Sequence, residues 1–569
     1  MFVKITKSGP RQYVQLVESY RDDQGRSKSR TVATLGRLDK LAEMDSVISG
    51  LIRLTGSKGT NLQTAPQRAQ TPVVEFESAR AFGDVWALDQ LWRELGFDAM
   101  AGIFRQARYS TAVEHIVRVM VFNRLCDPDS KLGVLRWLET VSIPEVEVSS
   151  ITHQRMLRSM DALMEHHEEV DNVLAKLLRP LIDQDLSLVF YDLTTIRAAG
   201  LSEVDGDVRR YGMAKEGLIA RQFMLGVVQT AEGLPIYHEV FDGNQSETKT
   251  LMPTLKTVLA RYPQIKRLIV VADRGLLSLN NIEELAKVRL PGGAPLEFIV
   301  AVPGRRYHEF AQLLEPFQKQ CQEASTEITG EVAWNGLRLA MAHDPDTARS
   351  QGSERKAKMD ELEKLAATWT GKLEAQDQGQ IKRGRKLSDS GAKARFYHAV
   401  CESHLGRIIK VDLKSELFVY TVDDAALTLA QMMDGKLLLV SNVADLTPVQ
   451  LVQRYKSLAD IERGFRVLKS EIEIAPVYHR LPQRIRAHAL ICFIALIMYR
   501  VMRTRLRMAK AGISPERALE KLRRIQHHSV TINASTPICG VSTINTAQAA
   551  VYAALNLKKP SQERQMNLL

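Results

Sequence analysis

The spacing of hydrophobic and polar positions changes several times along the chain, and the first change marks off a small N-terminal module. Short runs in which apolar and polar residues alternate predict β-strands, at 2–5, 13–18 and 31–35. A turn-rich Arg-Asp-Asp-Gln-Gly at 21–25 separates the last two runs. The polar residues 55–75, with Gly and Pro among them, then predict a linker.

From about residue 78 the apolar spacing is helical, and after 186 it becomes that of alternating strands and helices. The helical part reaches about 180 and predicts several short helices, which could hold a DNA-binding module. Five apolar runs then predict strands, at 186–196, 223–230, 234–241, 267–273 and 297–303. A helix is predicted at 248–262, before the fourth strand. This order predicts a mixed sheet covered by helices.

Residues 304–436 interrupt this alternation. They contain a charged helix at 354–369, a basic loop (IKRGRK) at 381–386 and strand-like segments at 396–421. The basic loop fits a solvated charge run as well as a nonspecific DNA contact. The elements predicted next are a strand at 436–442, a long helix at 448–470 and an apolar helix at 485–502. The chain after 503 is basic and mostly helical in pattern.

The composition is that of an ordinary globular protein, but positive charge is concentrated near the C-terminus. Hydrophobic residues are 45% and charged residues 25% of the chain, which excludes global disorder. The net charge is +11, while residues 450–569 alone hold 20 Lys and Arg against 7 Asp and Glu. Localised positive charge attracts a polyanion such as nucleic acid, although a solvated helical surface has the same composition. Charge alone therefore leaves nucleic-acid binding open.

Cysteine usage and apolar run length indicate a soluble protein of a reducing compartment. The five cysteines are scattered and form no C-x-x-C pair, which argues against a disulfide framework or a cysteine-based zinc module. The longest apolar run, Ala489–Tyr499, has 11 residues and is too short to cross a bilayer. The N-terminus lacks the long apolar stretch of a signal peptide. A cytoplasmic location is therefore expected, with no membrane partner.

Two carboxylates stand at corresponding places in the predicted sheet. Asp192 follows the apolar run 186–191, and Asp273 follows the run 268–272. For either residue alone, an Asx turn or a helix cap is the commoner explanation. Two carboxylates from separate strands of one sheet could also converge at one edge. Hard divalent cations bind such oxygen ligands on rigid elements, so the pair suggests a metal site.

The helix predicted at 448–470 carries a third carboxylate. Glu462 lies beside the apolar stripe of this helix. Tyr455, Glu462 and Lys469 are seven residues apart, which is nearly two turns, so they project from one side. Arg466, four residues after Glu462, shares that side, and an ordinary surface Glu–Arg pair would account for these two residues alone. A carboxylate flanked by Tyr, Arg and Lys also suits a metal-bound phosphodiester.

These motifs resemble those of the DDE transposases of bacterial insertion sequences, in the group with the signature Y-x2-R-x3-E-x6-K. The chain has Tyr455-x2-Leu458-x3-Glu462-x6-Lys469, so three of the four positions match and Leu458 replaces the Arg. VFYDLTT around Asp192 and VVADRGLLSLNN at 270–281 resemble the first and second Asp motifs. VATLGRLD at 32–39 and PVYHR at 476–480 are also similar to stretches of this family. The resemblance covers most of the chain.

The resemblance implies an α/β fold with a ribonuclease-H-like core, split by a partly β insertion between the second Asp and the Glu. The separations agree, with 81 residues from Asp192 to Asp273 and 189 from there to Glu462. The expected segments are an N-terminal β module (1–54), a linker (55–75), a helical, DNA-binding region (76–183), the core's first half (184–303), the insertion (304–436), the core's second half (437–506) and a basic helical tail (507–569). The insertion is expected to contact DNA.

The resemblance also implies a DNA transposase that binds the inverted-repeat ends of a mobile element. Asp192, Asp273 and Glu462 would be catalytic and would hold two Mg²⁺ ions, which Mn²⁺ could replace. The enzyme would cut DNA by phosphodiester hydrolysis and join the 3′ ends to target DNA. The expected DNA contacts are Tyr455, Arg463, Arg466 and Lys469.

The expected partners are element-end DNA and target DNA, bound by a homodimer that pairs two ends in the nucleoid of a bacterial cell. Two other functions remain open at this point. One is a metal-dependent nuclease that cleaves without joining. The other is a DNA-binding regulator whose core has lost catalysis.

Overall fold

The computed structural model describes most of the chain, with the residues 2–22, 24–37, 74–182, 187–200, 204–213, 219–273, 279–380, 387–532 and 536–560. Three sequence expectations lie wholly or largely outside these residues: the linker at 55–75, the basic loop at 381–386 and the part of the second Asp motif at 274–278. The chain forms two compact units, one of residues 1–74 with 532–535 and one of residues 75–531 with 536–569.

The first unit contains a three-stranded antiparallel sheet. Its strands follow each other in space as in sequence: β1 (Phe2–Ser8), β2 (Arg11–Arg21) and β3 (Ser27–Arg37). Val14 and Val17, on the central strand, are its buried apolar side chains. The small β module predicted from the alternating pattern is confirmed.

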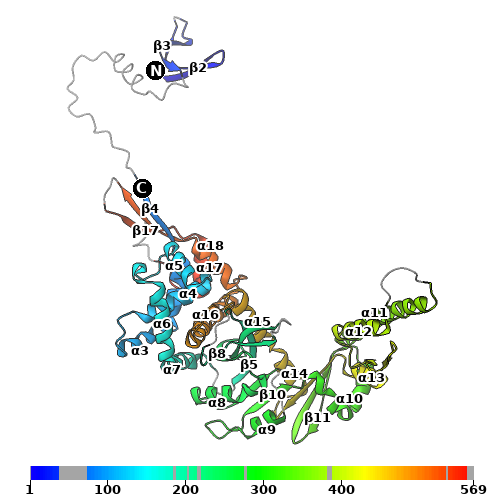
Figure 1. Ribbon diagram of the computed structural model, residues 1–569. Helices are drawn as coiled ribbons and strands as arrows, with labels where there is room; N and C mark the ends of the chain where they lie inside the picture. The colour runs from blue at the N-terminus through cyan, green and yellow to red at the C-terminus, as the bar shows by residue number, and fades with distance from the viewer. Residues whose placement is uncertain are drawn as a thin grey trace. The chain divides into compact units, whose positions relative to one another are not determined.

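A nine-stranded mixed sheet forms the centre of the second unit (Figure 1). Its strands are β5 (Ser187–Arg197), β6 (Arg210–Met213), β7 (Ile219–Thr230), β8 (Pro235–Asp242), β9 (Leu268–Ala272), β10 (Glu297–Ala301), β11 (Ile328–Trp334), β12 (Leu337–His343) and β15 (Lys436–Ser441). The antiparallel strands β8, β7 and β5 are followed by the parallel strands β9 and β10. This order, with helices on both faces, is the expected ribonuclease-H-like core.

Helices cover each face of this sheet because its strands are apolar on both sides. One face packs on α8 (Leu251–Arg261), α9 (Leu279–Lys287) and α10 (Ala311–Glu323). The other packs on α14 (Pro448–Lys456), α15 (Ala459–Ser470) and α16 (Pro482–Met508). Strands buried on both faces need long apolar runs, and those runs are what made β5, β7 and β9 predictable from the sequence.

The long helix α16 is the centre of the helical region. It packs on α4 (Val113–Cys126), α6 (His153–Glu165), α17 (Pro515–Arg523) and α18 (Thr546–Leu555). The rest of the region is formed by α2 (Gly83–Glu94), α3 (Met100–Gln106), α5 (Lys131–Thr140) and α7 (His167–Leu178). In length and composition α16 resembles a membrane-spanning helix, but 89% of its most apolar window is buried inside the protein. The apolar character of α16 is therefore that of a core helix.

The C-terminal segment, expected to be helical, also contains a β-hairpin. β16 (Gln526–Ile532) and β17 (Ile538–Val541) pair with each other, and β16 also pairs with β4 (Val74–Ala81). Glu77 accepts hydrogen bonds from the hydroxyls of Ser529 and Thr531 across this pairing. The tail is thus joined to the start of the helical region.

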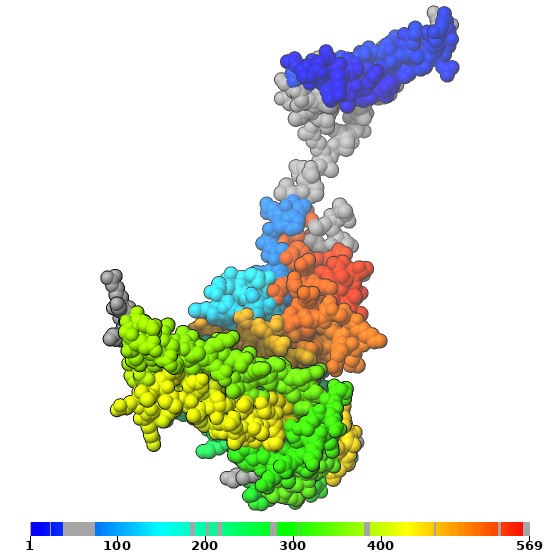
Figure 2. Space-filling view, turned by 90° about the vertical axis from the view of Figure 1, so that its right-hand side faces the viewer, coloured from blue at the N-terminus to red at the C-terminus, as the bar shows by residue number. Residues whose placement is uncertain are grey.

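The segment 304–436 has two parts. β11 and β12 extend the central sheet, whereas α11 (Pro345–Asp377), β13 (Ile409–Val411), β14 (Tyr420–Val422), α12 (Asp389–Glu402) and α13 (Asp424–Met433) surround a cluster of their own. Figure 2 shows these later elements, in yellow-green and yellow, beside the green part of the chain that precedes them. The prediction of a strand was wrong for residues 396–402, which belong to α12. Phe396 and Val400 lie about one helical turn apart on this helix and pack on α11.

A buried ion cluster fastens the loop after β5. Asp207 Oδ2 lies 2.8 Å from Arg209 Nη2 and 3.0 Å from Arg221 Nη2, and the side chains of Asp207 and Arg209 are fully buried. The guanidinium of Arg209 also donates to the backbone carbonyl of Arg480, and that of Arg221 to Gly200. Burial opposes ionisation of Asp207, but the hydrogen bonds from Arg209 outweigh it and hold the pKa of Asp207 below its usual range.

Substituting Asp207→Asn should destabilise the fold, because it leaves two buried guanidinium groups without their carboxylate. We expect the free energy of unfolding to fall by about 3–5 kcal/mol, measured by urea unfolding followed by tryptophan fluorescence. Asp205→Asn, at a nearby exposed position, is the control and should change it by less than about 0.5 kcal/mol. In the native protein the pKa of Asp207 in the folded state lies below its unfolded value of about 3.9. The contribution of the cluster to the free energy of unfolding is therefore complete at neutral pH. It is lost only as the pH falls through the folded pKa. Equal loss in both variants would contradict the role of the cluster.

Candidate active site

Asp192 and Asp273 lie side by side on neighbouring parallel strands. β5 and β9 pair with Tyr191 opposite Ala272, which is the last residue of β9. Asp192 and Asp273 are the next residues on the two chains, so they stand at the same level of the sheet. Asp192 lies within β5 rather than after it, since the strand continues to Arg197. Both aspartates are half-buried.

The two carboxylates face the same layer of helices. Side chains alternate along a strand, so Asp192 shares a face with Phe190, and Asp273 shares one with Val271. Phe190 and Val271 belong to the core cluster that α14, α15 and α16 cover. The backbone N–H of Leu193 donates to Asp192 Oδ1 at 2.7 Å, which fixes that carboxylate. Two acidic side chains thus point toward the same layer of helices.

Tyr455, on α14, contacts one of the two carboxylates. Its hydroxyl donates a hydrogen bond to Asp273 Oδ1 at 2.8 Å. The helix predicted at 448–470 is interrupted here, because α14 ends at Lys456 and α15 begins at Ala459. The N–H of Leu458 bonds to the carbonyl of Tyr455, three residues back, and tightens the turn between the two helices. The prediction of one uninterrupted helix over 448–470 was therefore wrong.

Leu458, where the family signature has Arg, is part of the apolar core. Its side chain is 9% exposed and belongs to the cluster between the sheet and α16. The next residue, Ala459, is exposed. An apolar residue at position 458 therefore suits the tightened turn, and this position presents no charge to the carboxylate pair.

The remaining predicted site residues lie on α15. Glu462, Arg463 and Arg466 are exposed, and Lys469 is half-buried. Leu468, on the opposite side of the helix, packs into the core, so the charged residues occupy the outer side of α15. The structure brings Asp192, Asp273 and Tyr455 together. It does not bring Glu462 into the same group.

Gly464 lets α15 approach the sheet, a feature that the sequence reasoning missed. A Cβ atom at this position would lie 2.7 Å from Gln229 Nε2 and 2.9 Å from Arg500 Nη2, both on buried side chains. Only glycine permits this approach without moving one of them. A glycine inside an otherwise amphipathic helix is the sequence signal for such close packing.

The donor set formed by Asp192 and Asp273 has the chemistry that a hard divalent cation requires. Two carboxylates on rigid, paired strands present oxygen ligands at one level. Among the described residues, no three His, Cys, Asp or Glu side chains are close enough to share an ion. The two aspartates thus fit as part of a metal site, and a third protein ligand would have to come from a neighbouring element.

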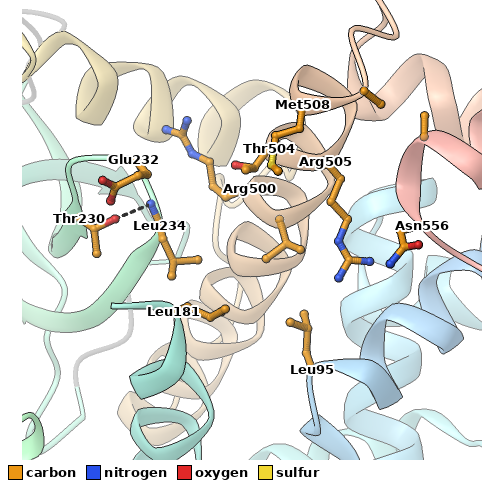
Figure 3. A pocket seen from close by; sticks show the side chains of 13 residues that line it. Leu95, Leu181, Thr230, Glu232, Leu234, Arg500, Thr504, Arg505, Met508 and Asn556 are labelled. Carbon is orange, nitrogen blue, oxygen red and sulfur yellow. Dashed lines mark hydrogen bonds between the residues drawn. The ribbon is translucent and has the colours of Figure 1, made fainter. Parts of the chain in front are cut away.

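An apolar pocket of about 600 Å³ lies away from these carboxylates (Figure 3). Figure 3 shows Arg500, Thr504 and Met508 of α16 on one side of it, and Glu232 and Leu234 of the β7–β8 turn on another. None of the predicted site residues lines it. The pocket is therefore separate from the candidate active site.

The chain is similar to known transposases in two segments. Residues 183–498 match the family model described as "Transposase DDE domain", and residues 3–63 match "IS1634 family transposase, N-terminal domain". A search of curated proteins finds no match. One similar solved structure is a "piggyBac transposase synaptic complex with hairpin DNA", with 10% identity, a TM-score of 0.33 and coverage of 78% of this chain and 76% of that one.

Restoring the signature with Leu458→Arg should destabilise the protein, because the new guanidinium would be placed in the apolar cluster. We expect the free energy of unfolding to fall by about 3 kcal/mol or more, measured by urea unfolding. Ala459→Arg adds the same charge at the exposed neighbouring position and should change it by less than about 0.5 kcal/mol. A Leu458→Arg variant as stable as the parent would show that position 458 opens to solvent.

Proposed function

The chain belongs to the transposase DDE domain family, whose model spans more than half of its length, and from this premise we propose that it cuts DNA at the ends of a mobile element and joins them to a target. The N-terminal match places it among the transposases of insertion sequences. The single observation that carries the proposal is the level placement of Asp192 and Asp273 on one face of the sheet, with Tyr455 bonded to Asp273. Paired carboxylates on rigid strands suit metal-assisted phosphodiester cleavage.

In this proposal Asp192 and Asp273 would hold two Mg²⁺ ions, which Mn²⁺ could replace, and Glu462, which the structure does not group with them, would be the third ligand. Bound ions of this kind supply a water nucleophile at neutral pH and stabilise the charge that develops on phosphate oxygens. Asp192 and Asp273 are held in place by their strands and by the hydrogen bonds from Leu193 and Tyr455. Glu462 comes from α15, which packs on the same face of the sheet.

The outer side of α15 is proposed to contact DNA. Arg463, Arg466 and Lys469 follow Glu462 on this helix and are exposed or half-buried. Their positive charge would hold the phosphates of an element end beside the carboxylates. The DNA partners are thus the inverted-repeat ends and the target, and a homodimer would pair two ends.

Cleavage and joining by the purified protein test this function. The probe is a labelled duplex carrying the inverted-repeat end that flanks the coding sequence, incubated with supercoiled target DNA in Mg²⁺. We expect cut ends and joined products, and we expect none in EDTA. Asp192→Asn, Asp273→Asn and Glu462→Gln should each abolish both products while end binding stays nearly unchanged.

Matched controls remove one carboxylate elsewhere. Glu471→Gln acts at the exposed end of α15, and Asp205→Asn acts in an exposed loop of the same unit. Both should retain full cleavage. Cleavage without joined products would leave a metal-dependent nuclease. Specific binding without cleavage in Mg²⁺ or Mn²⁺ would overturn the enzymatic function and leave a DNA-binding regulator.

Tyr455→Phe separates two roles for this hydroxyl. If Tyr455 positions Asp273, its loss should slow cleavage about tenfold, the value of one hydrogen bond to a charged group, and leave DNA affinity unchanged. If Tyr455 instead contacts a DNA phosphate, affinity should fall. Single-turnover cleavage and fluorescence anisotropy of the same variant measure the two effects. We expect the first result, because the hydroxyl already bonds to the carboxylate.

A further inference from the structure

A basic pocket lies outside the proposed active site, where three helices begin. Its volume is about 800 Å³. Lys131 is the first residue of α5 and His153 the first of α6, and both line the pocket. Leu481, which directly precedes α16, lines it as well. Each helix start directs backbone N–H groups and the positive end of the helix dipole outward, so three starts at one pocket favour an anion.

Lys131 places a buried cation in this pocket. The residue is 6% exposed, and no described residue pairs with its ammonium or accepts a hydrogen bond from it. Arg124, 5% exposed, also lines the pocket and donates only to the backbone carbonyls of Ile472 and Glu473 among the described residues. A buried charge without a counter-charge is costly. The two cations therefore lack the negative partner that would compensate their burial.

The titrating groups of the pocket respond to this uncompensated positive charge. Burial, followed by the charge of Arg124, lowers the pKa of Lys131 to about 7. Burial, followed by the charges of Lys131 and Arg484, lowers the pKa of His479 to about 3. Arg484 has its own partner, since it forms a two-point ion pair with Asp161. An anion in the pocket would stabilise the charged form of Lys131.

Two acidic residues line the pocket without neutralising Lys131. Asp129 pairs with Arg136 at 3.2 Å and accepts a hydrogen bond from the N–H of Ser130. Glu473 has an exposed side chain, and its backbone carbonyl faces Arg124. Neither carboxylate forms an ion pair with Lys131 or Arg124.

The surroundings of the pocket favour a DNA strand over a free phosphate ion. Tyr478, on its wall, is 70% exposed and offers an aromatic face on which a base can stack. A backbone hydrogen bond joins the wall of the pocket to the strand that carries Asp192. The N–H of Val477, which lines the pocket, donates to the carbonyl of Arg197 at the end of β5. Arg197 lies five residues beyond Asp192, which is about 17 Å along a strand. That length corresponds to about five base steps of DNA.

We propose that the pocket where α5, α6 and α16 begin binds a phosphate group of the DNA strand that leads into the active site, with Lys131 as its buried cationic contact. The identity of the ligand as DNA rests on the proposed function. The anion site itself rests on the helix starts and on the uncompensated buried cations.

Lys131→Met tests this site, because it removes the charged amino group and keeps an unbranched side chain of nearly the same length. Full-length protein is titrated with a labelled element-end duplex in EDTA, over a series of salt concentrations, by fluorescence anisotropy. We expect the dissociation constant to rise about tenfold, and the slope of its logarithm against that of salt concentration to fall by about one. The thermal midpoint of the variant should not fall, because a buried charge without a partner has been removed.

Lys176→Gln is the matched control, since it removes one charge from an exposed position on α7. It should change neither affinity nor slope. A Lys131→Met variant that keeps its thermal midpoint and binds DNA like Lys176→Gln would overturn the proposal. Because EDTA prevents cleavage, this outcome would leave the proposed transposase activity standing, and a failure of cleavage would leave the phosphate site standing.

Inorganic phosphate and Tyr478→Ala separate the two sources of a phosphate group. Phosphate should raise the thermal midpoint of the native protein above that in sodium chloride of equal ionic strength, and this gain should be absent in Lys131→Met. Tyr478→Ala should weaken DNA binding and keep the phosphate effect. If phosphate stabilises the protein through Lys131 while neither variant alters DNA binding, the site takes a free anion and the assignment to DNA is overturned.

Discussion

The parallel pairing of β5 with β9 is the constraint on which the candidate active site depends. A slip of one residue would turn one aspartate to the opposite face of the sheet, and a slip of two would separate the carboxylates by about 7 Å. The register is held by burial on both faces. Phe190 and Val271 pack toward α16, whereas Val189 and Val270 pack toward α8. The apolar core thus sets the position of the polar pair.

The strand β15 extends this constraint to the helix layer that contains α14 and α15. It pairs with β10, and Asn442 at its end bonds to the backbone of Leu296 and Phe298. α14 starts shortly afterwards at a capping box formed by Thr447 and Gln450. The entry point of Tyr455 and α15 is therefore fixed by the sheet. The cluster around α11 and α12 lies between β12 and β15, so it can vary in length without moving α14.

Much of the fold follows from local pattern, and the differences have physical causes. The strands of the central sheet were predicted because burial on both faces demands apolar runs. The interruption after Tyr455 was missed because a tightened helical turn needs no Gly or Pro. The pairing of β16 with β4 was missed because the two strands lie about 450 residues apart in the sequence. Asp192 and Asp273 could be predicted as site residues because each follows an apolar run. Their position side by side depends on the register of β5 with β9, which the sequence does not give. The sequence did not indicate a role for Lys131, because a lysine at the start of a helix is usually exposed and only the structure shows that this one is buried.

Part of the positive charge near the C-terminus forms ion pairs within the protein, whereas composition alone suggests that it binds nucleic acid. Arg484, Arg505 and Arg523 pair with Asp161, Glu94 and Asp84 of the helical region. Part of the surplus therefore holds α16 and α17 against the helices that precede the core, and is not available to DNA. The proposed phosphate contacts are therefore confined to the exposed side of α15 and the pocket at the start of α16. The helix α16 is the buried centre of the helical region, and its first turns line that pocket. A DNA strand bound in the pocket would therefore contact the same helix on which α15 packs. Binding of the strand and placement of Glu462 would thus be coupled through one rigid element.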